Sequence, residues 1–286
     1  MILKRTERHF LKDGKDRVKM RRSVRLISIL LLLTLVITAG HAEDALRGYD
    51  RKDGYVYVTL GRYMQSIDGG DPKEKNNTWT WAHDLTKDTS ELTIEKTPLI
   101  WRVLTADEEK IYLASEYVLF AMPMHKNYTE YKKIGEDFGQ TELCQYLNGE
   151  FAETAFTSEE MDMLLPCETF GKVFLLDSAD LKSKAEGMGV GNGLKCWGTE
   201  YAIRVTGLYV FQVKYGAHSA YWARNQSTTD KRHARCTKDG GQLGHIISDR
   251  ENEGVRPALY LDPNAYRIAS GSGTLEDPYV LEPKQE

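Results

Sequence analysis

The spacing of hydrophobic and polar residues along the chain predicts strands first, then helices, then strands again. Runs rich in β-branched, aromatic and other apolar residues predict strands at 55–61, 99–104, 110–114, 172–176, 219–224, 242–248 and 254–261. Apolar residues at i, i+3 and i+4, with capping residues before them, predict helices at 141–149, 158–165, from a cap at 177–180 to 186, and at 199–204. This order is typical of the α+β class, because an α/β protein alternates strands and helices.

The polar segments between these elements predict turns and loops. Residues 187–198, which begin with a glycine-rich run, and residues 225–241, which are polar and basic, are predicted to be long surface loops. Another polar and charged stretch covers 71–97 and begins at a Gly-Asp-Pro turn. Residues 265–282 are predicted to form a terminal hairpin. We find no repeat of fixed period, so residues 43–286 are predicted to form a single domain.

The first 42 residues have the pattern of a secretory signal peptide. Ten Lys or Arg and three acidic residues occupy positions 1–25, and 13 mostly apolar residues follow at 26–38. The small residues Gly40 and Ala42 fit a cleavage site after Ala42, and Met20 offers an alternative start with a shorter basic region. An uncleaved membrane anchor is the alternative, although a membrane span needs about 20 residues. Either pattern predicts an exported protein, secreted or at the cell surface.

We expect cleavage after Ala42 to release a mature chain of residues 43–286. N-terminal sequencing of protein recovered outside the cell is therefore expected to begin at Glu43. An intact Met1 or Met20 terminus in the membrane fraction would contradict cleavage.

Charge excludes one class of partner. The chain after residue 25 carries 28 basic and 39 acidic residues, a balance of −11, within a total of −4 for the whole chain. A body this acidic is a poor partner for nucleic acid, because that affinity rests on neutralising phosphates. It favours neutral glycans or basic protein surfaces as ligands.

No motif for a metal, a cofactor or a catalytic group stands out. The seven histidines are scattered without a His-Glu-x-x-His pattern, and there is no Cys-x-x-Cys. We therefore predict no metal, no cofactor and no catalytic residue. In an exported protein four cysteines allow three disulfide pairings, and buried thiols are an equal alternative. The cysteines are Cys144, Cys167, Cys196 and Cys236.

Seven short motifs occur in an order that resembles a known family. They are LGRYMQ at 60–65, PLIWRVL at 98–104, ELCQYLNGEF at 142–151, VFLL at 173–176, TEYA at 199–202, YWAR at 221–224 and GVRPAL at 254–259. In this order they resemble the bacterial family called domain of unknown function 6273, over residues 55–262. That family has no established activity and occurs in secreted and cell-surface proteins of Gram-positive anaerobes.

The closing motifs are also similar to the end of C-type-lectin-like and sulfatase-modifying-like domains. This resemblance implies a C-type-lectin-like α+β fold, with a twisted antiparallel sheet, a few helices and long loops. The chain departs from the family pattern at Met64, Cys144 and Ala223, and residues 71–97 look like an insertion.

We expect a secreted or cell-surface binding module without enzymatic activity. Its ligand would be an extracellular glycan, a wall polymer or another protein. The alternative is an extracytoplasmic enzyme of the sulfatase-modifying, formylglycine-generating type, which uses a cysteine pair, and Cys196 and Cys236 are the candidates for that pair. A structural surface domain is a third hypothesis.

The predicted ligand-binding residues lie on and beside the strand predicted at 219–224, between the two predicted loops. Aromatic rings stack on sugar rings, and Arg or Asn side chains hydrogen-bond to hydroxyls. The predicted residues are Trp197, Tyr221, Trp222, Arg224 and Asn225.

Three residues have a structural interpretation. Trp101 alternates with apolar neighbours in its predicted strand and is expected in the core. The guanidinium of Arg256 is expected to join strands through carboxylates or carbonyls. For Arg224 the same structural role and a ligand-binding role both stay open.

Overall fold

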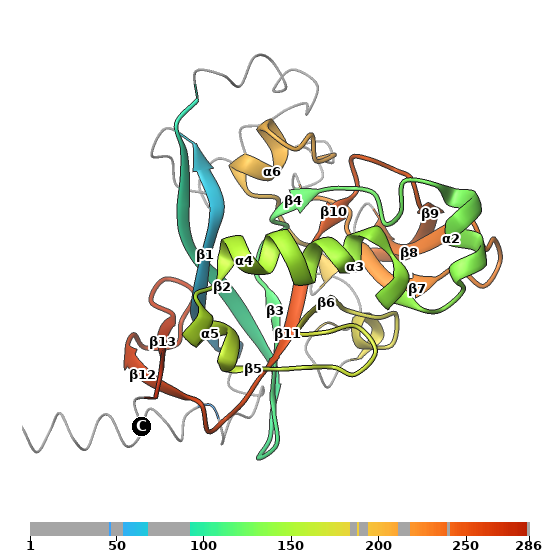
Figure 1. The fold of residues 1–286 in the computed structure, drawn as a ribbon. Helices are drawn as coiled ribbons and strands as arrows, with labels where there is room; N and C mark the ends of the chain where they lie inside the picture. Colours follow the sequence, from blue (N-terminus) through green and yellow to red (C-terminus); the bar gives the residue numbers. More distant parts are fainter. Residues whose placement is uncertain are drawn as a thin grey trace, which may run out of the picture. The chain divides into compact units, whose positions relative to one another are not determined.

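A mixed sheet runs through the described part of the chain in a computed structural model (Figure 1). The structure describes Leu46 and residues 54–67, 92–183, 188, 194–210, 218–238 and 241–284, and those from Leu46 onward belong to one unit. Four predicted features lie wholly or mostly outside the described residues: the signal peptide, the polar stretch at 71–97, the helix end after residue 183 and the glycine-rich run before residue 194.

The sheets are built from strands of 2 to 13 residues. They are β1 (Tyr57–Ile67), β2 (Ile94–Ala106), β3 (Ile111–Ser115), β4 (Phe120–Ala121), β5 (Leu164–Leu165), β6 (Val173–Leu175), β7 (Trp222–Gln226), β8 (His233–Lys238), β9 (Gln242–Ile247), β10 (Gly254–Val255), β11 (Pro257–Leu261), β12 (Tyr266–Ser270) and β13 (Tyr279–Pro283).

The described helices are all short. They are α2 (Tyr128–Ile134), α3 (Glu142–Tyr146), α4 (Ala152–Ala155), α5 (Ser158–Asp162) and α6 (Glu200–Arg204), with the 3-10 turns η4 (Phe138–Gln140) and η6 (Asp180–Lys182) and the π-helical turn η5 (Leu147–Phe151). Within the ranges that the structure describes, none has the length and apolar character needed to cross a bilayer.

The central sheet has eight strands among the described residues, in the order β12-β13-β1-β2-β3-β11-β5, with β6 also paired to β11. Neighbours are antiparallel except β1 and β13, which run parallel. Strands β2 and β3 form the hairpin predicted from the sequence, with Trp101 opposite Ser115. A largely antiparallel sheet with a few short helices confirms the α+β class.

One helical run crosses a face of this sheet in Figure 1. Segments α3, η5 and α4 follow one another without a break, and the ring of Phe151 packs 4.9 Å from that of Tyr63 on β1. The sequence predicts that this helix ends at Gly149, and the prediction is wrong. Gly149 has φ −109° and ψ −107° inside the π-helical turn, so the chain absorbs an extra residue there and continues to Ala155.

A second sheet contains β7, β8 and β9 in that order. The prediction of a long loop at 225–241 is wrong, because strand β8 occupies part of this range. Ala234 and Cys236 face the interior of the protein, whereas Arg235 between them is only partly buried. Of the basic residues that suggested a loop, Arg235 therefore lies on the outward face of a half-buried strand, and Lys231 and Arg232 lie in the turn before it.

Candidate functional site

Two of the predicted binding residues lie in the core. Tyr221 and Trp222 are both fully buried. The hydroxyl of Tyr221 donates to the carbonyl of Leu194 at 3.0 Å, and the indole Nε1 of Trp222 donates to the carbonyl of Met122 at 2.8 Å. The apolar part of each ring thus packs in the core, and its polar group donates a hydrogen bond to a backbone carbonyl of the protein. The prediction that these two rings stack on a ligand is corrected, because neither presents a face to solvent.

Arg224 and Asn225 hold a neighbouring turn in place. The guanidinium of Arg224 pairs with Asp177 at 2.6 Å and with Asp180 at 3.2 Å. The side-chain oxygen of Asn225 accepts the backbone N–H of Ser178 at 2.6 Å. These contacts fit the structural interpretation of Arg224 that the sequence left open.

Trp197 is partly buried and packs against the core, and its carbonyl accepts the N–H of Val118 at 2.9 Å. Ligand binding by Trp197 stays a prediction. Because Tyr221 and Trp222 are buried, the five predicted residues do not form one exposed surface.

The four cysteines are thiols in the structure. Cys196 and Cys236 are buried, and burial raises the pKa of each thiol. A nucleophilic cysteine needs a lowered pKa, since the thiolate is the reactive form. The Sγ of Cys196 lies 3.1 Å from the carbonyl of Glu116, so this thiol is part of the core packing.

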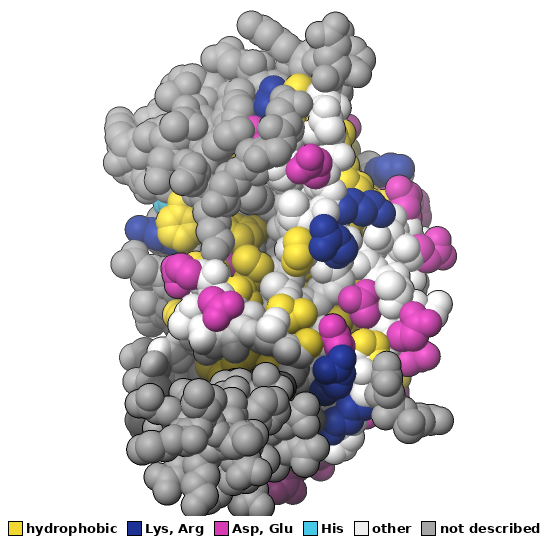
Figure 2. Space-filling model, turned by 90° about the vertical axis from the view of Figure 1, so that its left-hand side faces the viewer, with side chains coloured by type: hydrophobic (Ala, Val, Ile, Leu, Met, Phe, Trp, Pro, Cys, Tyr) yellow, Lys and Arg dark blue, Asp and Glu magenta, His cyan; other side chains and the backbone are white. Residues whose placement is uncertain are grey.

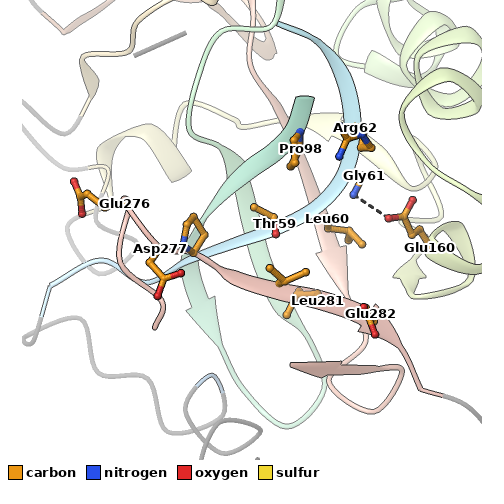
Figure 3. Close-up of a pocket in the computed structure, with 12 residues that line it drawn as sticks. Thr59, Leu60, Gly61, Arg62, Pro98, Glu160, Glu276, Asp277, Leu281 and Glu282 are labelled. Atoms are coloured by element: carbon orange, nitrogen blue, oxygen red, sulfur yellow. Dashed lines mark hydrogen bonds between the residues drawn. The ribbon is translucent and has the colours of Figure 1, made fainter. Parts of the chain in front are cut away.

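An open pocket of about 400 Å³ lies where β1, β13 and α5 meet (Figure 3). Strand β1 contributes residues 59–62, and β13 with the turn before it contributes 276–278 and 280–282. Pro98 of β2 and Glu160 of α5 complete the lining. The pocket is therefore formed mainly by residues near the beginning and near the end of the described chain.

Gly61 allows β1 and the helical run to approach closely. Its φ of +73° suits glycine, and a Cβ there would lie 2.7 Å from both the carbonyl of Ala155 and the ring of Phe156. Its N–H donates to the carboxylate of Glu160 at 3.2 Å, the dashed line in Figure 3. Glu160 also accepts the N–H of Thr157 in the capping box that begins α5, so the helix start fixes this carboxylate.

Four carboxylates and one guanidinium surround the pocket. Glu160 and Glu282 lie on one side in Figure 3, and Glu276 and Asp277 lie on the other. The guanidinium belongs to Arg62, whose Nη2 donates to the carbonyl of Lys96 at 2.9 Å. Acidic side chains thus face the pocket from both sides.

Two of the four carboxylates already interact with other groups of the protein. Glu160 is held at the start of α5, and Glu282 pairs with Arg267 across the β12–β13 hairpin. Within the described part of the chain, the carboxylates of Glu276 and Asp277 have no hydrogen-bond or ion-pair partner. These two are the ones most available to a ligand.

The floor of the pocket is apolar. Leu60, Pro98 and Leu281 line it together with Val280, which is 37% exposed. Figure 2 faces the side on which β12 and β13 lie in Figure 1, and it shows hydrophobic side chains exposed among acidic ones. An apolar floor ringed by carboxylates suits a ligand that joins an aliphatic portion to a positive charge.

Sequence reasoning missed this pocket because it depends on the parallel pairing of β1 with β13, in which Val58 lies opposite Tyr279. No local pattern predicts that pairing. The available signal was the Glu276-Asp277-Pro278 turn directly before an apolar strand. The sequence interpretation used it only as part of the terminal hairpin.

A family model described as domain of unknown function (DUF6273) matches residues 108–263, more than half of the chain. The matched range includes Glu160 and ends before β12, so most of the pocket lies outside it. No curated protein and no solved structure matches the chain.

Proposed function

This chain belongs to the family described as domain of unknown function (DUF6273), and on that premise we propose that it is a secreted or cell-surface binding module. The ligand that fits its geometry best is a basic protein or peptide, which places a positively charged side chain in the pocket between β1 and β13. The observation that carries this proposal is the set of four carboxylates around an apolar floor.

A lysine or arginine side chain matches both parts of the pocket. Its aliphatic stem packs on apolar surface while its charged head stays near water and acidic groups. Pro98 and Val280 offer the stem an exposed apolar surface, and Glu276 and Asp277 offer the head two unengaged carboxylates. The acidic balance of the chain after residue 25 also steers a basic partner toward the protein.

The same geometry favours a protein ligand over a neutral glycan. Sugar recognition typically uses exposed aromatic faces. Among the described residues that line the pocket, none is aromatic, and Tyr221 and Trp222 are buried elsewhere. Of the two ligand classes that the charge of the sequence favours, the basic protein surface is therefore the better match.

The proposal includes export and a C-type-lectin-like fold. The basic and apolar pattern at the N-terminus supports export. The largely antiparallel sheet crossed by a helical run, and the order of the closing motifs, support the lectin-like fold.

We expect the protein to bind a fluorescein-labelled oligolysine peptide, measured by fluorescence anisotropy, and not the matching oligoglutamate. The double variant Glu276→Gln with Asp277→Asn removes the two unengaged carboxylates without removing their side chains. Exposed charge pairs contribute about 0.2–1 kcal/mol each, so the double variant is expected to bind roughly two- to thirty-fold more weakly.

The matched control is Glu108→Gln with Glu109→Gln, which removes an equally charged and exposed pair from the β2–β3 turn. This control is expected to bind oligolysine as the parent protein does. Equal weakening in both double variants would show that only the overall negative charge matters, and it would contradict binding at the pocket. Capture of neutral glycans in place of oligolysine would contradict the proposed ligand class.

A further inference from the structure

Two histidines lie end to end on the outward side of the second sheet. His233 on β8 and His245 on edge strand β9 are diagonal neighbours, since His233 pairs with Ile247 and His245 pairs with Arg235. Their Nδ1 atoms lie 2.8 Å apart, and the ring centroids lie 5.1 Å apart. One ring therefore donates its Nδ1–H to the Nδ1 of the other, and this hydrogen bond joins the side chains of two neighbouring strands.

The oxygen groups beside the outer ring nitrogens set the direction of this hydrogen bond. The Nε2 of His233 lies 3.7 Å from the carboxylate of Asp230, which can only accept, so His233 carries its proton on Nε2 and accepts at Nδ1. His245 therefore donates from Nδ1, and its Nε2 lies 3.4 Å from the hydroxyl of Thr229, which can donate to it. Thr229 and Asp230 both belong to the turn between β7 and β8, so one turn fixes both tautomers.

The charged side chains around the two rings disfavour a positive charge on His245. Arg235 and Lys238 on β8 oppose that charge, whereas Asp230 favours it. Partial burial of the ring, the partner imidazole and these two cations together lower the pKa of His245. Arg232 donates to Asp230 through Nε and Nη2 and holds the pKa of that carboxyl below its ordinary range, so Asp230 keeps its charge in mild acid.

We propose that His233 and His245 form an acid-sensitive latch between β8 and β9, which holds the edge strand at neutral pH and loosens it when both rings are protonated. The first added proton binds the Nε2 lone pair of His245 and leaves the hydrogen bond between the rings in place. The second must bind the Nδ1 of His233, which ends that hydrogen bond and sets two cations against each other. Acid thus converts an attraction between the strands into a repulsion.

The lowered pKa of His245 gives the direction of the pH dependence. The stability that its neutral ring contributes is complete above the ordinary imidazole pKa of about 6.5 and is lost as the pH falls below that value. Among the described strands β9 pairs with β8 alone, so the latch acts on the single strand that holds it. The latch is separate from the acidic pocket and does not depend on the proposed function.

Hydrogen exchange of the tag-free protein tests the latch at about pH 8 and about pH 4.5, on either side of the ordinary imidazole pKa. After correction for the intrinsic effect of pH on exchange, the protection of β9 amides is expected to fall in acid by roughly two- to twelve-fold relative to that of β2 amides, the effect of losing one hydrogen bond. His233→Gln and His245→Gln, in which one ring no longer titrates, are each expected to show no such relative fall. With ¹⁵N-labelled histidine, NMR is expected to detect coupling between the two Nδ1 nuclei at the higher pH only.

The matched control is His125→Gln, which removes a titrating ring from a loop next to α3 and leaves the histidine pair intact. It is expected to keep the acid response of the parent protein, and circular dichroism at both pH values checks that each variant keeps its fold. Loosening of β9 in acid that is as large in His233→Gln or His245→Gln as in the parent protein would overturn the latch. Unchanged relative protection of β9 in the parent protein between the two pH values would overturn it as well.

Discussion

Replacing Trp101 by alanine is expected to lower the free energy of unfolding by about 3–5 kcal/mol. The indole is fully buried, and it stacks on Phe156 with centroids 6.2 Å apart and an interplanar angle of 24°. Its Nε1 donates to the carbonyl of Leu60 at 2.8 Å. Truncation therefore leaves a large cavity and removes the side-chain hydrogen bond to that carbonyl.

Urea unfolding followed by circular dichroism measures the effect. Trp101→Phe keeps part of the packed ring and loses the hydrogen bond, so it is expected to be less destabilised than the alanine variant. Trp197→Ala is the comparison, because that indole is only partly buried, and it is expected to lose less stability. A denaturation midpoint of Trp101→Ala equal to that of the parent protein would contradict the core position of Trp101.

The second large effect is expected at Glu116. Glu116→Leu is expected to destabilise the protein by about 3–5 kcal/mol, because removing one partner of a buried ion pair leaves an uncompensated charge. Arg102 donates to both carboxylate oxygens of Glu116 at 2.8 Å, and the two side chains are 8% and 7% exposed. The buried guanidinium of Arg256 also interacts electrostatically with Glu116, so two cations lose this carboxylate at once.

A double-mutant cycle with Arg102→Met tests this pair. Removing both charges restores an apolar contact, so the double variant is expected to lose less stability than the two single losses added together. The control cycle uses Arg267→Met and Glu282→Leu, a pair whose side chains are 47% and 45% exposed. Exposed pairs contribute about 0.2–1 kcal/mol, so the control is expected to change little. Simple additivity in the buried cycle would rule out coupling between Arg102 and Glu116.

The features that could be predicted from the sequence are those set by neighbouring residues. Thr157 and Glu160 form a capping box, and Thr199 caps α6, so both helices begin where their local pattern predicts. The apolar runs around Trp101 and Leu113 predict a hairpin, since a four-residue acidic turn joins them. These interactions need no knowledge of distant parts of the chain.

The features that could not be predicted depend on distant residues. The burial of Trp222 requires the carbonyl of Met122, 100 residues earlier, and an aromatic residue in a strand has the same local pattern in a core or on a surface. Strand β8 was mistaken for a loop because its outward face is basic and only Ala234 and Cys236 carry the apolar signal. The pocket likewise arises from the pairing of β1 with β13, which composition and spacing do not specify.

The parallel pairing of β1 with β13 makes one wall of the pocket depend on the last strand that the structure describes. Thr59 and Tyr279, which contact each other across this pairing, are 220 residues apart in the sequence. A protease that removed the chain from Glu276 onward would take away one wall of the pocket and expose the long edge of β1. An unpaired strand edge is a template for pairing with another molecule. A single cut would thus open the pocket and leave a fragment prone to aggregate, so loss of the pocket and loss of solubility would occur together.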